Sequence, residues 1–258
     1  HLEELMTLTD AVMVARGDLG VELPPEKVPG LQKKIVKLCR KWGKPVVVAT
    51  QMLDSMVHSP APTRAEASDV ATAVYDSADA VMLSAETAAG EYPIESVDMM
   101  NRIILEAEGD EAYQASTTSK QNVVEPTVSD AITLAARQVA ETVNANCIVT
   151  YTTSGSTTLR AARERPTVPI LCVTSSLLTA RRMAIAWGIH SVHIDQEERF
   201  STVVKRAVDI AETVCQEIAD ESHFPVLVHS VARSLLIGGS WSSLASLCID
   251  SWGLLFIH

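Results

Sequence analysis

Residues 11–15 (AVMVA), 46–49 (VVVA) and 80–83 (AVML) form three short apolar runs, each followed by polar residues and an amphipathic segment. The runs begin 35 and 34 residues apart. Strands that are apolar without alternation are typical of a parallel sheet covered on both faces. Strand–helix units of this length build (β/α)8 barrels, in which eight units take about 250 residues. The first hundred residues therefore predict three units of a partial TIM barrel, and about five more would be needed to close it.

The segments between the runs carry helix signals. Thr63 and Glu66 have the spacing of a capping box, and Pro93 can begin a third helix. Apolar residues at helical spacing define the expected inner faces. These are Leu31, Ile35, Leu38, Cys39 and Trp42 in the first helix, and Ile94, Val97, Met100 and Ile104 in the third.

A second α/β pattern follows a polar stretch. Residues 109–125 (GDEAYQASTTSKQNVVE) predict a linker between one domain at 1–108 and another at 126–258. In the second domain we expect strands at 147–151, 169–174, 190–194 and 225–231, with helices between them that include 177–187 and 200–219. The helix beginning at Thr127 should bury one face, made of Ile132, Ala135, Ala136, Val139 and Val143. This alternation predicts a doubly wound parallel α/β domain.

The composition argues against several classes of protein. The chain of 258 residues has a net charge of −11 and is 47% hydrophobic, a globular balance without the basic face of a nucleic-acid binder. No apolar run reaches the roughly 18 residues of a membrane span. The cysteines are scattered, and several lie in apolar runs, so we expect reduced, buried thiols in a cytoplasmic protein. They are Cys39, Cys147, Cys172, Cys215 and Cys248.

Polar residues follow each apolar run where a barrel strand would end. They are Arg16-Gly17-Asp18, Thr50-Gln51 and Ser84-Ala85-Glu86. Catalytic groups of βα barrels lie at these strand ends. A carboxylate, a hydroxyl and a backbone amide at a glycine suit a divalent metal and an anionic substrate. Aspartate and serine at strand ends can equally cap the next helix, and spacing alone leaves both interpretations open.

Four motifs, in order, closely resemble pyruvate kinases. They are residues 12–20 (VMVARGDLG), 44–56 (KPVVVATQMLDSM), 62–70 (PTRAEASDV) and 80–87 (AVMLSAET). The resemblance, of bacterial type, continues in the second domain at 151–166 (YTTSGSTTLRAARERP) and 186–188 (AWG). The order of the motifs and the family-like gaps between them make the resemblance specific.

The resemblance implies roles for the strand-end residues. Asp18 matches the aspartate that binds the essential Mg²⁺ (or Mn²⁺), and Gly17 matches the glycine whose amide meets the substrate carboxylate. Thr50 matches the threonine beside the reacting carbon of phosphoenolpyruvate, and it is the expected catalytic residue. Ser84 and Glu86 lie at the same rim without an assigned role.

We expect structural roles for three further sets of residues. Arg16 and the Arg64–Glu66 pair are expected to make subunit contacts or local salt bridges. His190 and His193 could suggest a metal pair, but residues three apart on a strand point to opposite faces, so ordinary packing is expected.

The resemblance also implies what the chain lacks. In the family the catalytic lysine and a second carboxylate ligand lie on the strand just before the position of His1, and residues 1–8 look like the end of a helix already begun. The K⁺ site, most ATP- and ADP-binding contacts and the lid domain lie earlier still. We therefore expect a fragment that is inactive alone. Its full-length form would be a homotetrameric phosphotransferase of glycolysis that makes pyruvate and ATP from phosphoenolpyruvate and ADP.

A Ser/Thr/Gly loop in the second domain is another candidate site. It comprises Thr153, Ser154, Gly155, Ser156 and Thr157. Amides and hydroxyls where a strand passes into a helix can hold an anion. In regulated pyruvate kinases the matching loop holds a phosphate of an allosteric sugar phosphate, so the resemblance implies such an effector. A plain Ser/Thr turn is the alternative.

The sequence departs from the family pattern after about Ala232. It reads RSLLIGG at 233–239 and then becomes rich in Ser, Trp and Leu. The two explanations are a reading-frame change near Val231 and simple divergence.

A second hypothesis for function is a non-catalytic module, left from a pyruvate kinase, that binds a sugar phosphate or mediates assembly.

Overall fold

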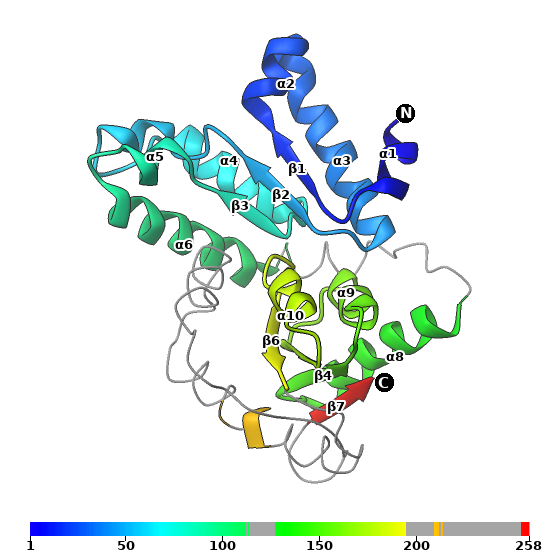
Figure 1. Cartoon of the computed structure of the whole chain (residues 1–258). Helices are drawn as coiled ribbons and strands as arrows, with labels where there is room; N and C mark the ends of the chain where they lie inside the picture. Colours follow the sequence, from blue (N-terminus) through cyan, green and yellow to red (C-terminus); the bar gives the residue numbers. More distant parts are fainter. Residues whose placement is uncertain (112, 114–126, 195–208, 212, 214–253, 258) are drawn as a thin grey trace. The chain divides into compact units, whose positions relative to one another are not determined.

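A computed structural model describes residues 1–111, 113, 127–194, 209–211, 213 and 254–257 (Figure 1). The described residues fall into two compact units, one ending at Tyr113 and the other beginning at Thr127. Each unit holds a parallel β-sheet and helices. The fold class is α/β with parallel sheets, consistent with the predicted partial TIM barrel and α/β domain. The expected linker lies mostly outside the described residues.

The first unit alternates strands with helices as the apolar runs predict. Its sheet has the order β1-β2-β3, from strands β1 (Val12–Ala15), β2 (Val46–Ala49) and β3 (Ala80–Met82). Around them lie α1 (Leu2–Leu8), α2 (Arg16–Glu22), η1 (Pro25–Lys27), α3 (Val28–Trp42), η2 (Asp54–Val57), α4 (Arg64–Tyr75), α5 (Ala85–Ala88) and α6 (Pro93–Gly109). Neighbouring strands in the sheet are neighbours in sequence, as in the wall of a barrel.

One face of this sheet is packed and the other is partly open. Val14, Val48 and Val81 are buried in a core with side chains of α3, α4 and α6. Met13, which alternates with Val14 along β1, is 55% exposed, and Met82 is half-buried. The apolar runs predicted cover on both faces, but the face opposite the helices is only partly covered: Ala49 and Ala80 are buried there, whereas Met13 is exposed.

The helix signals are confirmed at the starts of the helices. Thr63 and Glu66 form a capping box at α4, and Pro93 is the first residue of α6. Two expected inner-face residues are exposed instead, Trp42 by 42% and Ile94 by 79%. Both lie at an extreme end of their helices, beyond the turns that contact the sheet, so helical spacing alone overestimated the length of the buried face.

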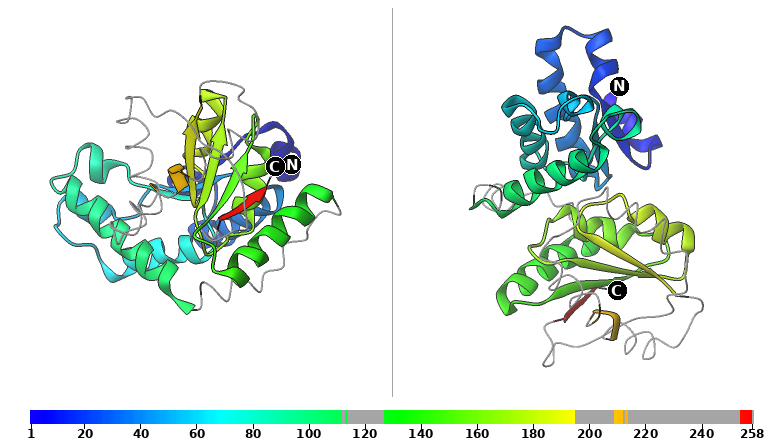
Figure 2. Two further views of the ribbon diagram at one scale, coloured as in Figure 1. Left: turned by 90° about the horizontal axis from the view of Figure 1, so that it is seen from below. Right: turned by 90° about the vertical axis from the view of Figure 1, so that its left-hand side faces the viewer.

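The second unit has the sheet order β6-β5-β4-β7, all parallel. Its strands are β4 (Cys147–Tyr151), β5 (Ile170–Thr174), β6 (Ile189–His193) and β7 (Leu254–Ile257), and its described helices of known bounds are α8 (Val128–Val143), α9 (Ser156–Arg163) and α10 (Leu177–Met183). The chain moves outward from β4 to β6 and returns to β7 on the other side of β4. Figure 2 shows α8 (green) running alongside this sheet next to β7 (red). The order is that of a doubly wound sheet.

Both faces of this second sheet are buried. Ile148, Ile170 and Cys172 face a core with α8, α9 and α10, while Val149 and Val173 face a second core that includes Ala211. Alternate residues of a strand point to opposite faces, so these continuous apolar strands are covered on both sides.

The packed face of α8 differs from the predicted one. Ala136 is buried as predicted, but Ile132 and Val143 are 45% and 49% exposed, and the other buried positions are Asp130, Thr133 and Ala140. The Asp130 carboxylate lies 3.1 Å from the guanidinium groups of Arg160 and Arg163 on α9. A buried charge needs such partners, so these ion pairs fix the rotation of α8 against its apolar pattern.

The predicted helix at 177–187 ends four residues early, at Met183. The Trp187 ring lies beneath the Arg165 guanidinium, 4.8 Å from its centre, and Gly188 takes a φ of 67°. The chain therefore leaves the helix in time to begin β6 at Ile189.

Other predictions fall partly outside the described residues. These include most of the expected helix at 200–219, the expected strand at 225–231, Cys215 and Cys248. Cys39, Cys147 and Cys172 are buried, as expected. Burial raises the pKa of the Cys39 thiol to about 12, and the nearby Asp79 carboxylate adds to this effect. Burial also raises the pKa of the Cys172 thiol to about 11.

Among the described helices, none has the length and apolar character that crossing a membrane requires.

The capping box generates a pH prediction. Burial alone would raise the pKa of Glu66, but hydrogen bonds from Ser55 and Thr63 outweigh it and lower that pKa from 4.5 to about 2. Because the folded-state pKa is lowered, the stabilisation is complete above pH 4.5 and is lost as the pH falls towards 2. In urea unfolding from pH 6 to pH 2.5, Glu66→Gln should therefore flatten the acid loss of stability. Glu95→Gln, on the exposed first turn of α6, should not; equal acid limbs in both variants would contradict the assignment.

Candidate functional site

Two predicted site residues are in direct contact at the ends of neighbouring strands. The Gly17 amide, in the first turn of α2, donates a hydrogen bond of 2.8 Å to Oγ1 of Thr50, the residue after β2. The Thr50 hydroxyl in turn donates to the Ala49 carbonyl over 2.6 Å. The amide expected to meet a substrate carboxylate and the hydroxyl expected beside the reacting carbon therefore share one small volume.

The backbone at this point has an uncommon conformation. Thr50 and Gln51 have φ values of 70° and 54°, in the left-handed region. A β-branched residue is a genuine outlier there, and such a residue costs on the order of 1–3 kcal/mol. Neither position is a glycine or asparagine, so surrounding contacts must hold the turn in place.

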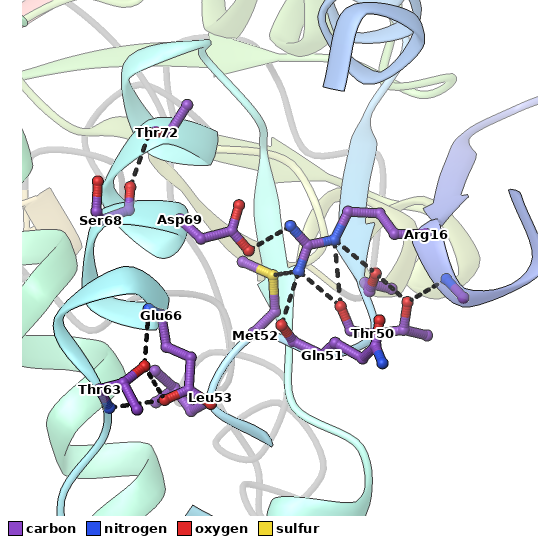
Figure 3. A network of polar contacts seen from close by, with 12 residues as sticks. Arg16, Thr50, Gln51, Met52, Leu53, Thr63, Glu66, Ser68, Asp69 and Thr72 are labelled. Atoms are coloured by element: carbon purple, nitrogen blue, oxygen red, sulfur yellow. Dashed lines mark hydrogen bonds and ion pairs between the residues drawn. The ribbon is translucent and has the colours of Figure 1, made fainter. Parts of the chain in front are cut away.

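The side chain of Arg16 provides those contacts (Figure 3). Its Nη2 donates to the carbonyl oxygens of Thr50, at 2.6 Å, and Gln51, at 3.0 Å, and lies 2.8 Å from Sδ of Met52. Its Nη1 forms an ion pair with Asp69 on α4. The expectation of a local salt bridge for Arg16 is therefore confirmed.

Two glutamates hold the residues that follow the turn at Thr50 and Gln51. Glu86, only 2% exposed, accepts hydrogen bonds from the Leu53 amide at 3.1 Å and the Ser84 amide at 2.7 Å. Glu66 accepts from both the amide and the hydroxyl of Ser55, at 2.7 and 2.6 Å. The carboxylate of Glu86 is thus committed to backbone groups, and this geometry favours a bracing role for it over a role at the rim. Ser84 is half-buried, at the N-cap of α5.

Asp18 lies beside Gly17 in the first turn of α2, with its side chain exposed. The N-cap of α2 is Ala15, so Asp18 does not occupy the N-cap position itself. Mg²⁺ favours one or two carboxylates together with waters and substrate oxygens, and a single exposed carboxylate at a strand end has suitable donor chemistry. Within the described residues, no cluster of three His, Cys, Asp or Glu side chains could hold a metal by itself.

Gly17 is not required by the backbone. A Cβ at this position would lie 3.6 Å from Thr50 Oγ1, an ordinary contact, and its φ is not in the left-handed region. The missing side chain at Gly17 instead leaves open the space next to the Thr50 hydroxyl.

The loop after β4 has a different construction. The Gly155 amide donates to Thr152 Oγ1 over 3.0 Å, and Gly155, not a serine or threonine, is the N-cap of α9. Gly155 has a φ of 86°, a conformation that strains other residues, and a Cβ there would lie 2.7 Å from Met183 Cε. Ser154 and Ser156 are exposed, with their hydroxyls 3.1 Å apart. The structure thus presents two exposed hydroxyls at the start of a helix.

Sequence reasoning missed the partners that hold the first site. Arg16 and Asp69 are 53 residues apart, and Glu86 and Leu53 are 33 apart. Both acidic residues lie within the quoted motifs, but short motifs do not show which residues meet across the sheet. His193, by contrast, packs as expected, with Nε2 at 3.2 Å from the Ser175 carbonyl oxygen.

Parallel strands in sequential order, a strand-end site and a following doubly wound sheet define a chain built from part of an α/β barrel and an α/β domain. The family model described as pyruvate kinase, barrel domain, matches residues 1–97, and the one described as pyruvate kinase, alpha/beta domain, matches residues 130–235. The chain belongs to the pyruvate kinase family.

Named relatives agree with this assignment. A pyruvate kinase of Methylorubrum extorquens is 54% identical over 192 residues, covering 74% of this chain and 40% of the relative. One from Agrobacterium vitis is 48% identical over 222 residues, covering 86% and 47%. The crystal structure of a Cryptosporidium parvum pyruvate kinase matches with a TM-score of 0.74 at 37% identity, covering 84% and 44%. The chain thus spans less than half the length of each of these proteins.

The bracing role of Glu86 can be tested by replacing its side-chain carboxylate with the amide of glutamine. Glu86→Gln replaces an accepting oxygen by an NH₂ group, which leaves the amide of Leu53 or Ser84 unpaired and should cost about 1–3 kcal/mol in urea unfolding. Glu91→Gln, whose side chain is 62% exposed beside His58, is the matched control and should change stability by less than about 0.5 kcal/mol. Equal small effects of the two substitutions would show that the Glu86 contacts contribute little.

Proposed function

We propose that residues 1–108 form part of the active site of a phosphotransferase that converts phosphoenolpyruvate and ADP to pyruvate and ATP. The hydrogen bond between the Gly17 amide and Thr50 Oγ1 carries the proposal, because it brings two family-matched residues together at the strand ends. Membership of the pyruvate kinase family supports the same reaction.

Each residue of the site has a proposed task. The Gly17 amide binds the substrate carboxylate, and that carboxylate competes with Thr50 Oγ1 for the amide. Displacement leaves the Thr50 hydroxyl, still bonded to Ala49, beside the reacting carbon. The Asp18 carboxylate would hold Mg²⁺ or Mn²⁺, which supplies neutralisation of the negative charge on the transferring phosphoryl group. In this proposal K⁺ binds outside this chain.

We also propose that this chain is inactive when it is alone. Phosphoryl transfer relies on several preorganised charges, and removing one typically costs about 10²–10³ in rate. We infer that this chain provides only part of that set, because the family's lysine and second carboxylate match positions that it does not contain. The complete form is proposed to be a cytoplasmic homotetramer.

The proposed function is tested in an enzyme of full length. It can be made by joining this chain to the part of the Methylorubrum extorquens relative that the chain does not span. We expect pyruvate formation from the joined enzyme, none above background from the chain alone, and a loss of about 10²-fold or more in Asp18→Asn. A coupled pyruvate assay with Mg²⁺, K⁺, phosphoenolpyruvate and ADP measures all three.

A matched carboxylate provides the control for Asp18. Asp10 lies just before β1, at the opposite edge of the sheet, where barrel residues serve stability instead of catalysis. Asp10→Asn should therefore keep near-normal turnover in the joined enzyme. Normal turnover in Asp18→Asn would leave Asp18 as a charge that only favours the start of α2.

The alternative function, binding of a sugar phosphate by the second unit, has its own supporting observation. The loop after β4 lies at the carboxyl end of the strand where the sheet order reverses, between β5 and β7. Ligands of doubly wound sheets bind at such a switch point. The exposed hydroxyls of Ser154 and Ser156 and the start of α9 suit a phosphate group, and Thr153 and Thr157 flank them.

Calorimetric titration of the complete chain with several sugar phosphates tests this site. We expect heat of binding that is lost in Ser154→Ala/Ser156→Ala, because both hydroxyls are exposed and neither supports the core. Ser129→Ala, an exposed serine in the first turn of α8, is the control and should bind as the unmodified chain does. Absence of heat at millimolar ligand would leave the loop as a structural turn.

A further inference from the structure

We propose that Arg16, fixed by Asp69, is a positioning residue that holds the Thr50–Gln51 turn in its left-handed conformation and thereby places the Thr50 hydroxyl at the Gly17 amide. The proposal rests on the proposed function only in that Thr50 and Gly17 serve catalysis. Nothing in the family motifs distinguishes this role from a subunit contact, whereas the contacts of the guanidinium do.

The first argument is the direction of the carbonyl groups. The turn at Thr50 and Gln51, with φ values of 70° and 54°, brings two successive carbonyl oxygens towards one cation. Nη2 of Arg16 donates to both, and Nε donates to the Thr50 carbonyl at 3.2 Å. A positive charge at this place favours the strained turn over conformations that separate the two carbonyls.

The second argument is that consecutive residues hold Thr50 from two sides. The Arg16 side chain binds the Thr50 carbonyl, and the Gly17 amide binds the Thr50 hydroxyl. Backbone and side chain of one threonine are thus both fixed by the first turn of α2. Loss of the Arg16 contact would therefore release the Thr50 backbone on one side and loosen the placement of Oγ1.

The third argument concerns Asp69. The Arg16 side chain is only 12% exposed, and the Asp69 carboxylate pairs with Nη1, on the far side of the guanidinium from the turn (Figure 3). This arrangement uses three nitrogens of the planar fork at once. A lysine has one nitrogen and cannot bridge the turn and Asp69 in the same way.

The test measures the site separately from overall stability. In the complete chain, hydrogen exchange of the Gly17 amide, followed by NMR, reports its bond to Thr50, and a strong intraresidue HN–Hα NOE reports the positive φ of Thr50. We expect Arg16→Lys to accelerate exchange at Gly17 about tenfold or more and to weaken the NOE. Asp69→Asn, which leaves the carbonyl contacts in place, should have a smaller effect in the same direction.

A second ion pair on the same part of the fold is the matched control. Lys33 on α3 pairs at 2.5 Å with Asp76, the C-cap of α4, away from the turn. Lys33→Met should leave exchange at Gly17 unchanged. Unchanged exchange in both Arg16→Lys and Asp69→Asn, or equal acceleration in Lys33→Met, would overturn the proposal. If Arg16→Lys fails to fold, Asp69→Asn decides by the same measurement.

Kinetics of the joined enzyme then separate positioning from structure. A displaced Thr50 hydroxyl should lower kcat by about 10²-fold in Arg16→Lys, with little change in KM for phosphoenolpyruvate, because a small misplacement acts on the chemical step. An unchanged kcat in a variant whose Gly17 amide exchanges faster would refute a positioning role. An inactive unmodified joined enzyme would count against the proposed function alone, since the exchange measurements would still decide the role of Arg16.

Discussion

Parallel pairing of β1, β2 and β3 places Ala15, Ala49 and Met82 abreast, and the candidate site depends on this register. The residues that follow the three strands therefore meet at one edge of the sheet. The register is fixed by burial, because Val14 and Val48 face the helices, and a slip of one residue would turn alternate side chains to the other face. The hydrophobic core thus determines which polar residues come together.

The segment after β2 shows how this edge becomes rigid. Each of the three strand–helix units contributes one charged side chain to it: Arg16 holds Thr50 and Gln51, Glu86 holds Leu53, and Glu66 holds Ser55. Arg16 donates hydrogen bonds to main-chain carbonyl groups, and the two glutamates accept hydrogen bonds from main-chain amides. These groups would otherwise lack partners in a loop. The conformation of residues 50–55 is consequently a property of the whole unit and not of the local sequence.

This distribution explains what the sequence could predict. The apolar runs located β1, β2 and β3 to within one residue, because continuous burial leaves a continuous pattern. The capping box at Thr63 was equally legible, since both partners lie within four positions. The left-handed turn at Thr50 had no such signal, because its cause is an arginine 34 residues away. The rotation of α8 was mispredicted for the same reason, as Asp130 finds its partners on α9.

The pairing of β4 with β7 has a consequence for the making of the protein. Cys147 of β4 lies opposite Leu254 of β7, whereas its other neighbour, β5, follows within 25 residues. A ribosome adds roughly 5–20 residues per second, so one edge of β4 waits several seconds for its partner to be synthesised. An apolar parallel strand with an open edge is a template for wrong pairing. Slow translation or a high concentration of nascent chains should therefore affect the second unit more than the first, whose described strands lie within residues 12–82.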